Sequence, residues 1–355
     1  MTGVITRVII LPRITLQPMS ALKLRELQPM TDKRVWGSGI GAIMVNMRNA
    51  LPQHDGEIYL TDAGVETDLI FNHGIEIREF AAHTLLDDAI GLNALINYFT
   101  GFLELARERE VGFILDSQTW KAHSHWAHAL GSSNEELQYA NQRSLRVMSE
   151  LRSTFSSNAR PIVLNAVVGP RGDAYVSEHR WSVDDARKYH SKQMSWLSET
   201  EADMVTAMTF TSSDEASGLV MAAQDFGLPA VVSFTVETDG RLPSGETIQD
   251  AIQSVDCRTD ASAEYFMVNC AHPTHFSHIL RDADWARRIR GLRCNASAKS
   301  HAELDASEFL DDGDPFEMGH QNAALRAEMP WLHIFGGCCG SDLRHVTEIA
   351  NALGI

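Results

Sequence analysis

Pro161–Val168, which reads PIVLNAVV, is a short apolar stretch rich in Val, Ile and Leu. A continuous apolar run of this length is expected for a strand that is buried on both faces of a parallel sheet. The following segment begins at Ser182, and Asp184 and Asp185 stand in its first turn, a pattern that predicts a capped helix. A second apolar run, Asp203–Met208, comes after that helix. This order predicts a parallel strand–helix–strand unit.

The same alternation repeats along the chain. Amphipathic segments include Gly91–Glu110, a helix that Ser133 opens with a capping box, and a last helix that Ser341 is expected to cap. Eight alternations predict the α/β class, with a single (β/α)8 TIM barrel over residues 51–355 and an open doubly wound sheet as the fallback. The expected strands are Glu57–Asp62, Gly112–Asp116, Pro161–Val168, Asp203–Met208, Pro229–Thr235, Tyr265–Asn269, Leu292–Ala296 and Trp331–Phe335.

Residues 1–50 differ from the rest in composition. They contain seven Lys or Arg residues against two acidic residues, and three prolines interrupt any periodicity. We interpret them as an N-terminal extension that is either disordered or upstream of a true start at Met44 or Met47. A targeting peptide, which the basic bias favours, is the competing interpretation.

The composition limits the classes of partner. The chain of 355 residues is 44% hydrophobic and 22% charged and has a formal net charge of -17. So acidic a surface repels phosphates and anionic lipid, and we therefore expect no nucleic acid and no membrane as partner. We find no apolar run of about 18 residues. Five cysteines without a secretory signal indicate a reducing compartment, and we expect a cytoplasmic location.

The strongest chemical signal follows the last expected strand, where Cys338 and Cys339 stand between glycines. A disulfide between neighbours would be strained, because adjacent Cα atoms lie about 3.8 Å apart and disulfides prefer about 4.4–6.8 Å. Cys270 follows another expected strand, and the carboxyl ends of barrel strands converge on one mouth. We predict that these three cysteines hold Zn2+ and leave its fourth position open, as in catalytic zinc sites.

Other readings of the ligand-type residues remain. Cys257 and Cys294 lack a glycine frame, and we expect them to be small apolar residues. His123, His125 and His128 could form a second metal site, but no carboxylate accompanies them at ligand spacing, so we expect polar helix or loop residues. A zinc- or redox-sensing protein without enzymatic activity is a further alternative, and it would have a closed metal site.

These residues resemble the homocysteine S-methyltransferase family, which includes the betaine–homocysteine and the S-methylmethionine-dependent methyltransferases. The resemblance covers about residues 57–353 and implies a (β/α)8 barrel with zinc on the three cysteines. It also implies an enzyme that moves a methyl group from an onium donor (S-methylmethionine, S-adenosylmethionine or betaine) to a zinc-bound thiol, with homocysteine, giving methionine, as the first candidate. The segments that carry it are Leu60-Thr61-Asp62-Ala63-Gly64-Val65-Glu66-Thr67, Val168-Gly169-Pro170, Ser233-Phe234-Thr235, Arg241-Leu242-Pro243-Ser244-Gly245-Glu246, Asn269-Cys270, Asn295 and Gly336-Gly337-Cys338-Cys339-Gly340.

The resemblance also implies positions for substrate contacts. Asp62 and Gly64 would line the acceptor pocket, Asn269 would orient the metal ligand that follows it, and Asn295 would lie at the mouth of the barrel. Trp120 would contact a donor cation through its ring, or it is an ordinary core aromatic. No catalytic side chain beyond the metal ligands is implied. The expected partners are small molecules, a thiol acceptor and a methyl donor, and a homo-oligomer stays open.

The chain departs from the family pattern after two strands. The family usually carries Glu-Thr after the fourth strand, where the carboxylate grips the amino group of homocysteine, and the matching pair is Met208-Thr209. Glu215 or Asp116 would have to compensate for the missing acid. The family's Ser-Tyr-Gln becomes Thr119-Trp120-Lys121. A methyltransferase or demethylase with a different pair of thiol and methyl donor is therefore the alternative function.

Overall fold

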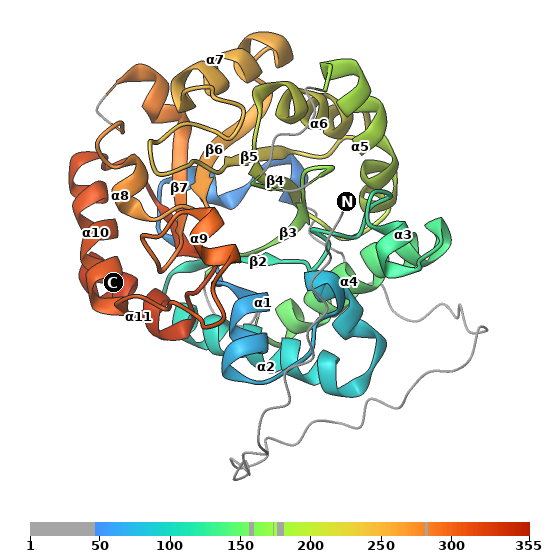
Figure 1. Ribbon diagram of the computed structural model, residues 1–355, viewed down its shortest axis with the longest axis horizontal. Helices are drawn as coiled ribbons and strands as arrows, with labels where there is room; N and C mark the ends of the chain where they lie inside the picture. The colour runs from blue at the N-terminus through green and yellow to red at the C-terminus, as the bar shows by residue number, and fades with distance from the viewer. Residues whose placement is uncertain (1–46, 156–159, 173, 176–180, 281–282) are drawn as a thin grey trace. The chain divides into compact units, whose positions relative to one another are not determined.

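Eight strands form a closed barrel in the computed structural model, which describes residues 47–155, 160–172, 174–175, 181–280 and 283–355. Every strand pairs in parallel with the next, and β8 pairs with β1. Figure 1 shows this barrel at the centre of a ring of helices. The predicted TIM barrel is confirmed. The strands are β1 (Tyr59–Leu60), β2 (Gly112–Asp116), β3 (Ile162–Val168), β4 (Met204–Phe210), β5 (Ala230–Phe234), β6 (Ala263–Asn269), β7 (Ile289–Cys294) and β8 (Ile334–Gly337).

Helices connect successive strands on the outside of the barrel. The α-helices are α1 (Val65–Thr67), α2 (Ala89–Glu108), α3 (Ala127–Leu130), α4 (Asn134–Phe155), α5 (Val183–Ser198), α6 (Ser213–Asp225), α7 (Ile248–Thr259), α8 (Pro273–Phe276), α9 (His301–Asp305), α10 (Pro315–Glu328) and α11 (Leu343–Leu353). Short 3-10 helices are η1 (Met47–Asn49), η2 (Pro52–Asp55), η4 (Arg78–Phe80), η5 (Ala82–Asp87) and η6 (Asp284–Arg288), and η3 (Asp68–Asn72) is a π-helix.

Most of the predicted N-terminal extension, residues 1–46, lies outside the described residues. Its last part does contact the barrel. The Arg48 guanidinium donates hydrogen bonds to the carbonyl oxygens of Ala202 (2.7 Å) and Thr200 (2.8 Å). The backbone N–H of Met47 donates to the Asp203 carboxylate at 3.1 Å. These bonds hold η1 against the turn that precedes β4.

The helix caps agree with the sequence at two of the three predicted positions. Ser182 caps α5 by accepting from the N–H of Asp185, and Ser133 with Glu136 forms the capping box of α4. The prediction for the last helix is wrong by one residue, because Asp342 caps α11 in a reciprocal pair with His345. Ser341 instead donates from Oγ to the Cys338 carbonyl oxygen at 2.7 Å.

Two strands, the seventh and the eighth, begin further from the predicted residue than the others do. The seventh covers Ile289–Cys294 and not Leu292–Ala296, because Arg290 and Gly291 interrupt the apolar pattern at the start of the strand. The eighth covers Ile334–Gly337, while Trp331 lies in a turn and donates from Nε1 to the Ala286 carbonyl oxygen at 3.1 Å. The shift in β8 brings the strand directly up to the cysteine pair.

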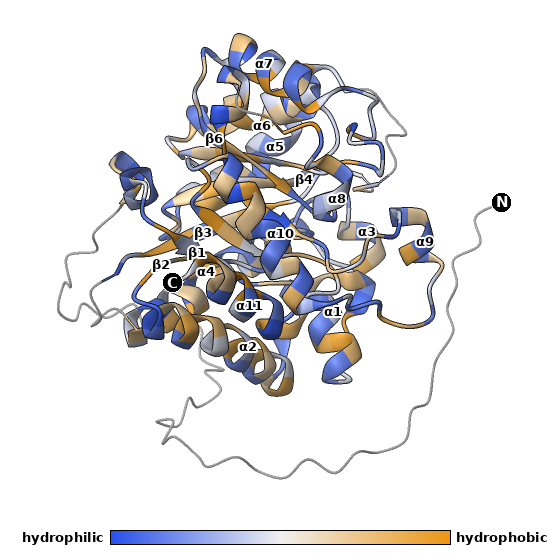
Figure 2. Ribbon diagram, turned by 90° about the vertical axis from the view of Figure 1, so that its left-hand side faces the viewer, coloured by the Kyte–Doolittle hydropathy of each residue, from blue (hydrophilic) through white to orange (hydrophobic). Residues whose placement is uncertain are grey.

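The core has an apolar layer inside one end of the barrel and a larger layer between strands and helices. Tyr59, Ile114, Met204, Tyr265 and their neighbours fill the barrel at the amino-terminal ends of the strands. Figure 2 shows apolar strands in the interior and hydrophilic faces on the outer helices. Because this end is packed with side chains, the opposite end of the barrel is left to hold a ligand.

One described helix, α2, is long and apolar enough by length and composition to cross a membrane. Its residues Phe99, Phe102 and Leu103 are buried in the barrel core. A core helix of a barrel meets the same criteria, so this observation is weak evidence for a span.

Protonation of His83 is expected to destabilise the barrel. His83 is buried in η5, its Nδ1 has no hydrogen-bond partner among the described residues, and burial lowers its pKa from 6.5 to about 4. The unfolded chain therefore binds a proton between pH 6.5 and 4 that the folded chain does not bind. This contribution to stability is present above pH 6.5 and is lost as the pH falls toward 4.

We expect His83→Gln to reduce the dependence of the free energy of unfolding on pH. Between pH 7 and 4 the wild type should lose about 2–3 kcal/mol more free energy of unfolding than the variant. Urea unfolding at several pH values measures the difference, and His128→Gln, at an exposed histidine, controls for the loss of an imidazole. Parallel curves for wild type and H83Q would contradict the assignment.

Candidate active site

Three cysteine sulfurs meet at the carboxyl ends of the strands. Cys270 directly follows β6, and Cys338 and Cys339 directly follow β8. The Sγ atoms of Cys270 and Cys339 lie 3.5 Å apart, and all three sulfurs lie within 4.8 Å of one another. In the described part of the chain, this is the one group of three or more His, Cys, Asp or Glu residues close enough to hold a metal ion. The cysteines are free thiols, so Cys338 and Cys339 form no disulfide.

Cys270 has an unusual backbone conformation for a residue with a side chain. Its φ angle is 55°, in the left-handed region that favours glycine. The N–H of Cys270 donates to the Arg293 carbonyl oxygen at 3.1 Å. Its own carbonyl oxygen accepts from Thr235 Oγ1 (3.2 Å) and lies 2.7 Å from Nε2 of His301. These bonds hold the strained residue so that its thiol meets the other two.

The loop after β1 packs tightly against the cysteine pair. A Cβ atom on Gly64 would lie 2.5 Å from the Cys338 carbonyl oxygen, so a side chain at this position would displace one of the two loops. The N–H of Gly340, a residue with φ of 78°, donates to Thr67 Oγ1 at 3.0 Å. Glycine is therefore needed at position 64 for close approach and at position 340 for its backbone angle.

A cavity of about 500 Å³ opens above the three sulfurs. Four of the five residues predicted to contact substrate line it, namely Asp62, Gly64, Trp120 and Asn295. Asn269, the fifth, is fully buried beside the cavity. Its Oδ1 accepts from the N–H of Thr209 at 3.1 Å, and its Nδ2 lies 3.9 Å from the Cys338 sulfur. Asn269 thus packs against the loop of the cysteine pair from the buried side.

A buried arginine under the cavity was missed by the sequence analysis. Arg293 extends from β7 into the barrel, where it forms ion pairs with Asp62 (2.5 Å) and with Asp116. Its Nε also donates to the Gly337 carbonyl oxygen at 3.2 Å. The signal that could have revealed it is a charged residue inside an otherwise apolar strand, since such a residue needs a buried partner.

The electrostatics of the site follow from burial and from this arginine. Burial raises the pKa of Asp62, and the nearby Arg293 opposes that shift. Hydrogen bonds from Cys270 and Cys339 lower the pKa of Cys338 well below its usual range, and Arg293 adds to the effect. The hydrogen bond to Cys338 raises the pKa of Cys270, and the hydrogen bonds to Cys270 and Cys338 raise that of Cys339. Among the groups that lower the pKa of Cys338, the cation is Arg293.

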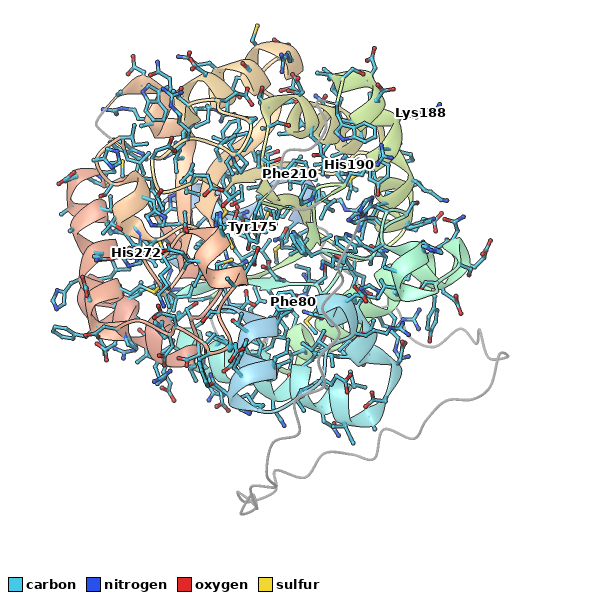
Figure 3. The ribbon with its side chains drawn as sticks, in the orientation of Figure 1. Phe80, Tyr175, Lys188, His190, Phe210 and His272 are labelled. Carbon is cyan, nitrogen blue, oxygen red and sulfur yellow. The ribbon has the colours of Figure 1, made fainter. Side chains whose placement is uncertain are left out.

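A tyrosine and a histidine cover the sulfurs from the loops after β3 and β7. The Tyr175 hydroxyl lies 3.0 Å from the Cys270 sulfur and 3.9 Å from that of Cys339. Its ring stacks on His301 with centroids 4.0 Å apart. In Figure 3 Tyr175 lies near the centre of the ring of helices, whereas Lys188 lies at the outer edge. No motif in the sequence pointed to either residue.

The two departures from the family pattern both lie at the cavity. Met208 lines it with an apolar side chain, and its carbonyl oxygen accepts from Trp120 Nε1 at 2.9 Å. Thr209 has a φ angle of 66° and is held by Asn269. Lys121 has its Nζ 5.7 Å from the centre of the Trp120 ring and donates to the Glu79 carbonyl oxygen. The protein's own cation therefore lies beside the ring that was expected to meet a donor cation.

The two acids considered as replacements for the missing carboxylate already have protein partners. Glu215 accepts from the N–H of Arg171 at 2.7 Å and lies 3.1 Å from Nε2 of His190. Asp116 lines the cavity but pairs with Arg293. Glu66, a further carboxylate, lies in the cavity wall and belongs to the motif after the first strand, to which the sequence assigned no role at this position.

The three histidines considered as a second metal site do not come together with further ligands. His123 is buried with its Nδ1 2.7 Å from the Tyr189 hydroxyl, and burial lowers its pKa well below the usual range. His125 is exposed and packs edge-on against Trp126. His128 is also exposed. They are polar residues of a loop and a short helix, as expected.

Removal of the buried arginine is expected to destabilise the protein strongly. Arg293→Met would leave the carboxylates of Asp62 and Asp116 buried without their cation, which typically costs about 3–5 kcal/mol. Chemical unfolding measures the loss, and Arg146→Met, at an exposed arginine of α4, provides the control. Equal unfolding midpoints for R293M and R146M would show that the ion pairs contribute little.

Comparisons with known proteins agree with this architecture. The sequence profile described as homocysteine S-methyltransferase matches residues 59–353. The oxidized form of the homocysteine methyltransferase MmuM from Escherichia coli superposes with a TM-score of 0.65 at 15% identity, over 86% of this chain and 99% of that chain. Its metallated form gives a TM-score of 0.62 at 16% identity, over the same shares. These identities support the fold, and the profile match over most of the chain shows that it belongs to the homocysteine S-methyltransferase family, a family of methyltransferase enzymes.

Proposed function

We propose that this protein transfers a methyl group from an onium donor to a thiol acceptor that is activated by zinc on Cys270, Cys338 and Cys339. The observation that carries the proposal is the convergence of these sulfurs within 4.8 Å at the floor of a cavity of about 500 Å³. Homocysteine, giving methionine, is the first acceptor to test because of the family to which the chain belongs.

The three cysteines fit a zinc ion. With zinc–sulfur bonds of about 2.3 Å, tetrahedral geometry places sulfur ligands about 3.8 Å apart. The 3.5 Å between the sulfurs of Cys270 and Cys339 is close to that value. Three thiolates leave one position for a substrate. When bound, zinc would lower the pKa of the acceptor thiol, so that its sulfur can attack the methyl carbon at neutral pH.

The chain's own residues position the reactants and limit the access of water. Tyr175 and His301 cover Cys270, whose exposed fraction is 2%. Arg293 offsets part of the negative charge that three thiolates bring to the site. The cavity has room for a small thiol and a donor side by side, so that the acceptor sulfur, the methyl carbon and the leaving atom can lie in line.

The same chemistry on a different thiol is the second candidate. Met208 favours it, because this position near the carboxyl end of β4 carries no carboxylate for the ammonium group of homocysteine. A screen that crosses homocysteine, selenohomocysteine and other thiols with S-methylmethionine, S-adenosylmethionine and betaine separates the two candidates. Mass spectrometry of the methylated products identifies donor and acceptor together. Turnover with a thiol other than homocysteine would select the second candidate, and no turnover with any pair would contradict both.

Loss of one thiol should remove the metal and the activity together. Cys338→Ala leaves two protein ligands, too few to retain zinc through dialysis. Elemental analysis and methyl-transfer assays measure both effects. Cys257→Ala, at an exposed thiol away from the cavity, should keep both metal and activity. Full turnover by a metal-free C338A protein would exclude the proposed mechanism.

A further inference from the structure

One carboxylate in the cavity wall has no protein partner. Asp62 and Asp116 pair with Arg293, and Asp311 lies 2.8 Å from the Lys299 ammonium nitrogen. Asp305, on the exposed face of α9, is also partnered. Glu66 differs from all of these. Apart from its own backbone N–H, no group in the described part of the chain forms a hydrogen bond or ion pair with its carboxylate.

Glu66 is nevertheless held firmly in place. It lies in α1, between Gly64 and Thr67, and both of these residues are bonded to the loop of the cysteine pair. The N–H of Gly64 donates to the Ser341 carbonyl oxygen at 3.2 Å, and Thr67 Oγ1 accepts from Gly340. Burial, with a smaller contribution from the nearby Cys338, raises the pKa of Glu66 to about 7. The backbone around Glu66 is therefore fixed, and its side chain is a partly buried group near Cys338.

A second group without a partner lies across the cysteine loop. Asn295 is 2% exposed, it lines the cavity, and its Oδ1 has no hydrogen-bond partner among the described residues. β8 lies between β7 and β1 in the barrel, so Cys338 stands between Asn295 and Glu66. A buried amide oxygen without a hydrogen-bond partner destabilises the folded protein. Two hydrogen-bond acceptors without partners, one on each side of the loop of the cysteine pair, point to a ligand that donates hydrogen bonds.

A positively charged group on the thiol that accepts the methyl group would donate such hydrogen bonds. Met208, near the carboxyl end of β4, offers no charge, and the other carboxylates of the cavity already have partners. The nearest cations of the protein, Lys121 and Arg293, act on Glu66 only through space, since neither forms an ion pair with it. An ammonium group bound beside the acceptor thiol would give the Glu66 carboxylate the ion-pair partner that it lacks.

We propose that Glu66 binds the ammonium group of the acceptor and thereby selects amino thiols, with Asn295 as a further acceptor on the opposite side. This inference rests on the proposed function, because it assigns the residue that recognises the acceptor of that reaction. Glu66 is a specificity residue, and it takes no part in holding the metal.

A pair of thiols that differ by one group tests the proposal. Homocysteine and 4-mercaptobutanoate have the same chain and the same carboxylate, and only homocysteine carries the ammonium group. Isothermal titration of the zinc-loaded protein gives a Kd for each thiol. In the wild type we expect homocysteine to bind more tightly, by roughly 10- to 100-fold.

Glu66→Gln keeps the shape of the side chain and removes its charge. It should weaken homocysteine binding by roughly 10- to 100-fold and leave 4-mercaptobutanoate within about threefold, since only one of them makes the charged hydrogen bond. Glu66→Asp should recover part of the loss. Glu104→Gln, at an exposed position of α2, is the matched control and should change neither Kd. Zinc content should equal that of the wild type in all three variants.

The outcomes separate the inference from the function on which it rests. If E66Q weakens both thiols equally, or neither, the role of Glu66 is overturned. Equal Kd values for the two thiols in the wild type would overturn it as well, while the methyl-transfer proposal stands. If the wild-type protein binds neither thiol and methylates neither, the proposed function fails first. Normal zinc content in E66D, with partial recovery, shows that the effect of E66Q is not a loss of folding.

Discussion

A buried guanidinium between two carboxylates is the interaction on which the site depends. Arg293 from β7 reaches Asp62 after β1 and Asp116 in β2, and it also donates to the backbone of Gly337 in β8. Four strand ends are thereby fixed relative to one another beneath the cysteines. Burying such charges is costly, and well-packed apolar residues often give equal stability. We interpret the network as a means of fixing geometry, since it aligns the two loops whose backbones nearly touch at Gly64 and Cys338.

The barrel divides its interior between two tasks. The amino-terminal end is filled by apolar and aromatic side chains around Tyr59 and Tyr265, and this packing provides the rigid base. The carboxyl-terminal end contains charged and polar groups, most of which form a hydrogen bond or ion pair with one specific partner. Asn269 supports Thr209, His301 holds the backbone of Cys270, and Tyr175 contacts its sulfur. The few side chains that remain without partners at this end are therefore informative about ligands.

The sequence predicted the architecture well because buried parallel strands leave a simple apolar signature. All eight strands are present. The largest errors fall where the apolar signature and the strand do not coincide: Arg290 and Gly291 interrupt the signature inside β7, and the apolar Trp331 extends it before β8. The three cysteines could be found from their position after strands and from the glycines around one pair. Tyr175 could not, because it comes from a loop whose path depends on tertiary packing. The role of Glu66 was equally hidden, since a carboxylate without a partner is recognised only once all of its neighbours are known.

If the three cysteines hold zinc as proposed, the left-handed backbone of Cys270 has a consequence for the order of folding and metal binding. A residue with a side chain is less stable in this conformation by about 1–2 kcal/mol, so an unfolded chain rarely adopts it. The barrel therefore has to close before the third sulfur points correctly, and the metal meets a nearly finished set of ligands. In this respect the centre differs from small zinc modules, in which the ion itself drives the chain to fold. Mutations that destabilise β6 locally would then lower the affinity for the ion before they unfold the barrel.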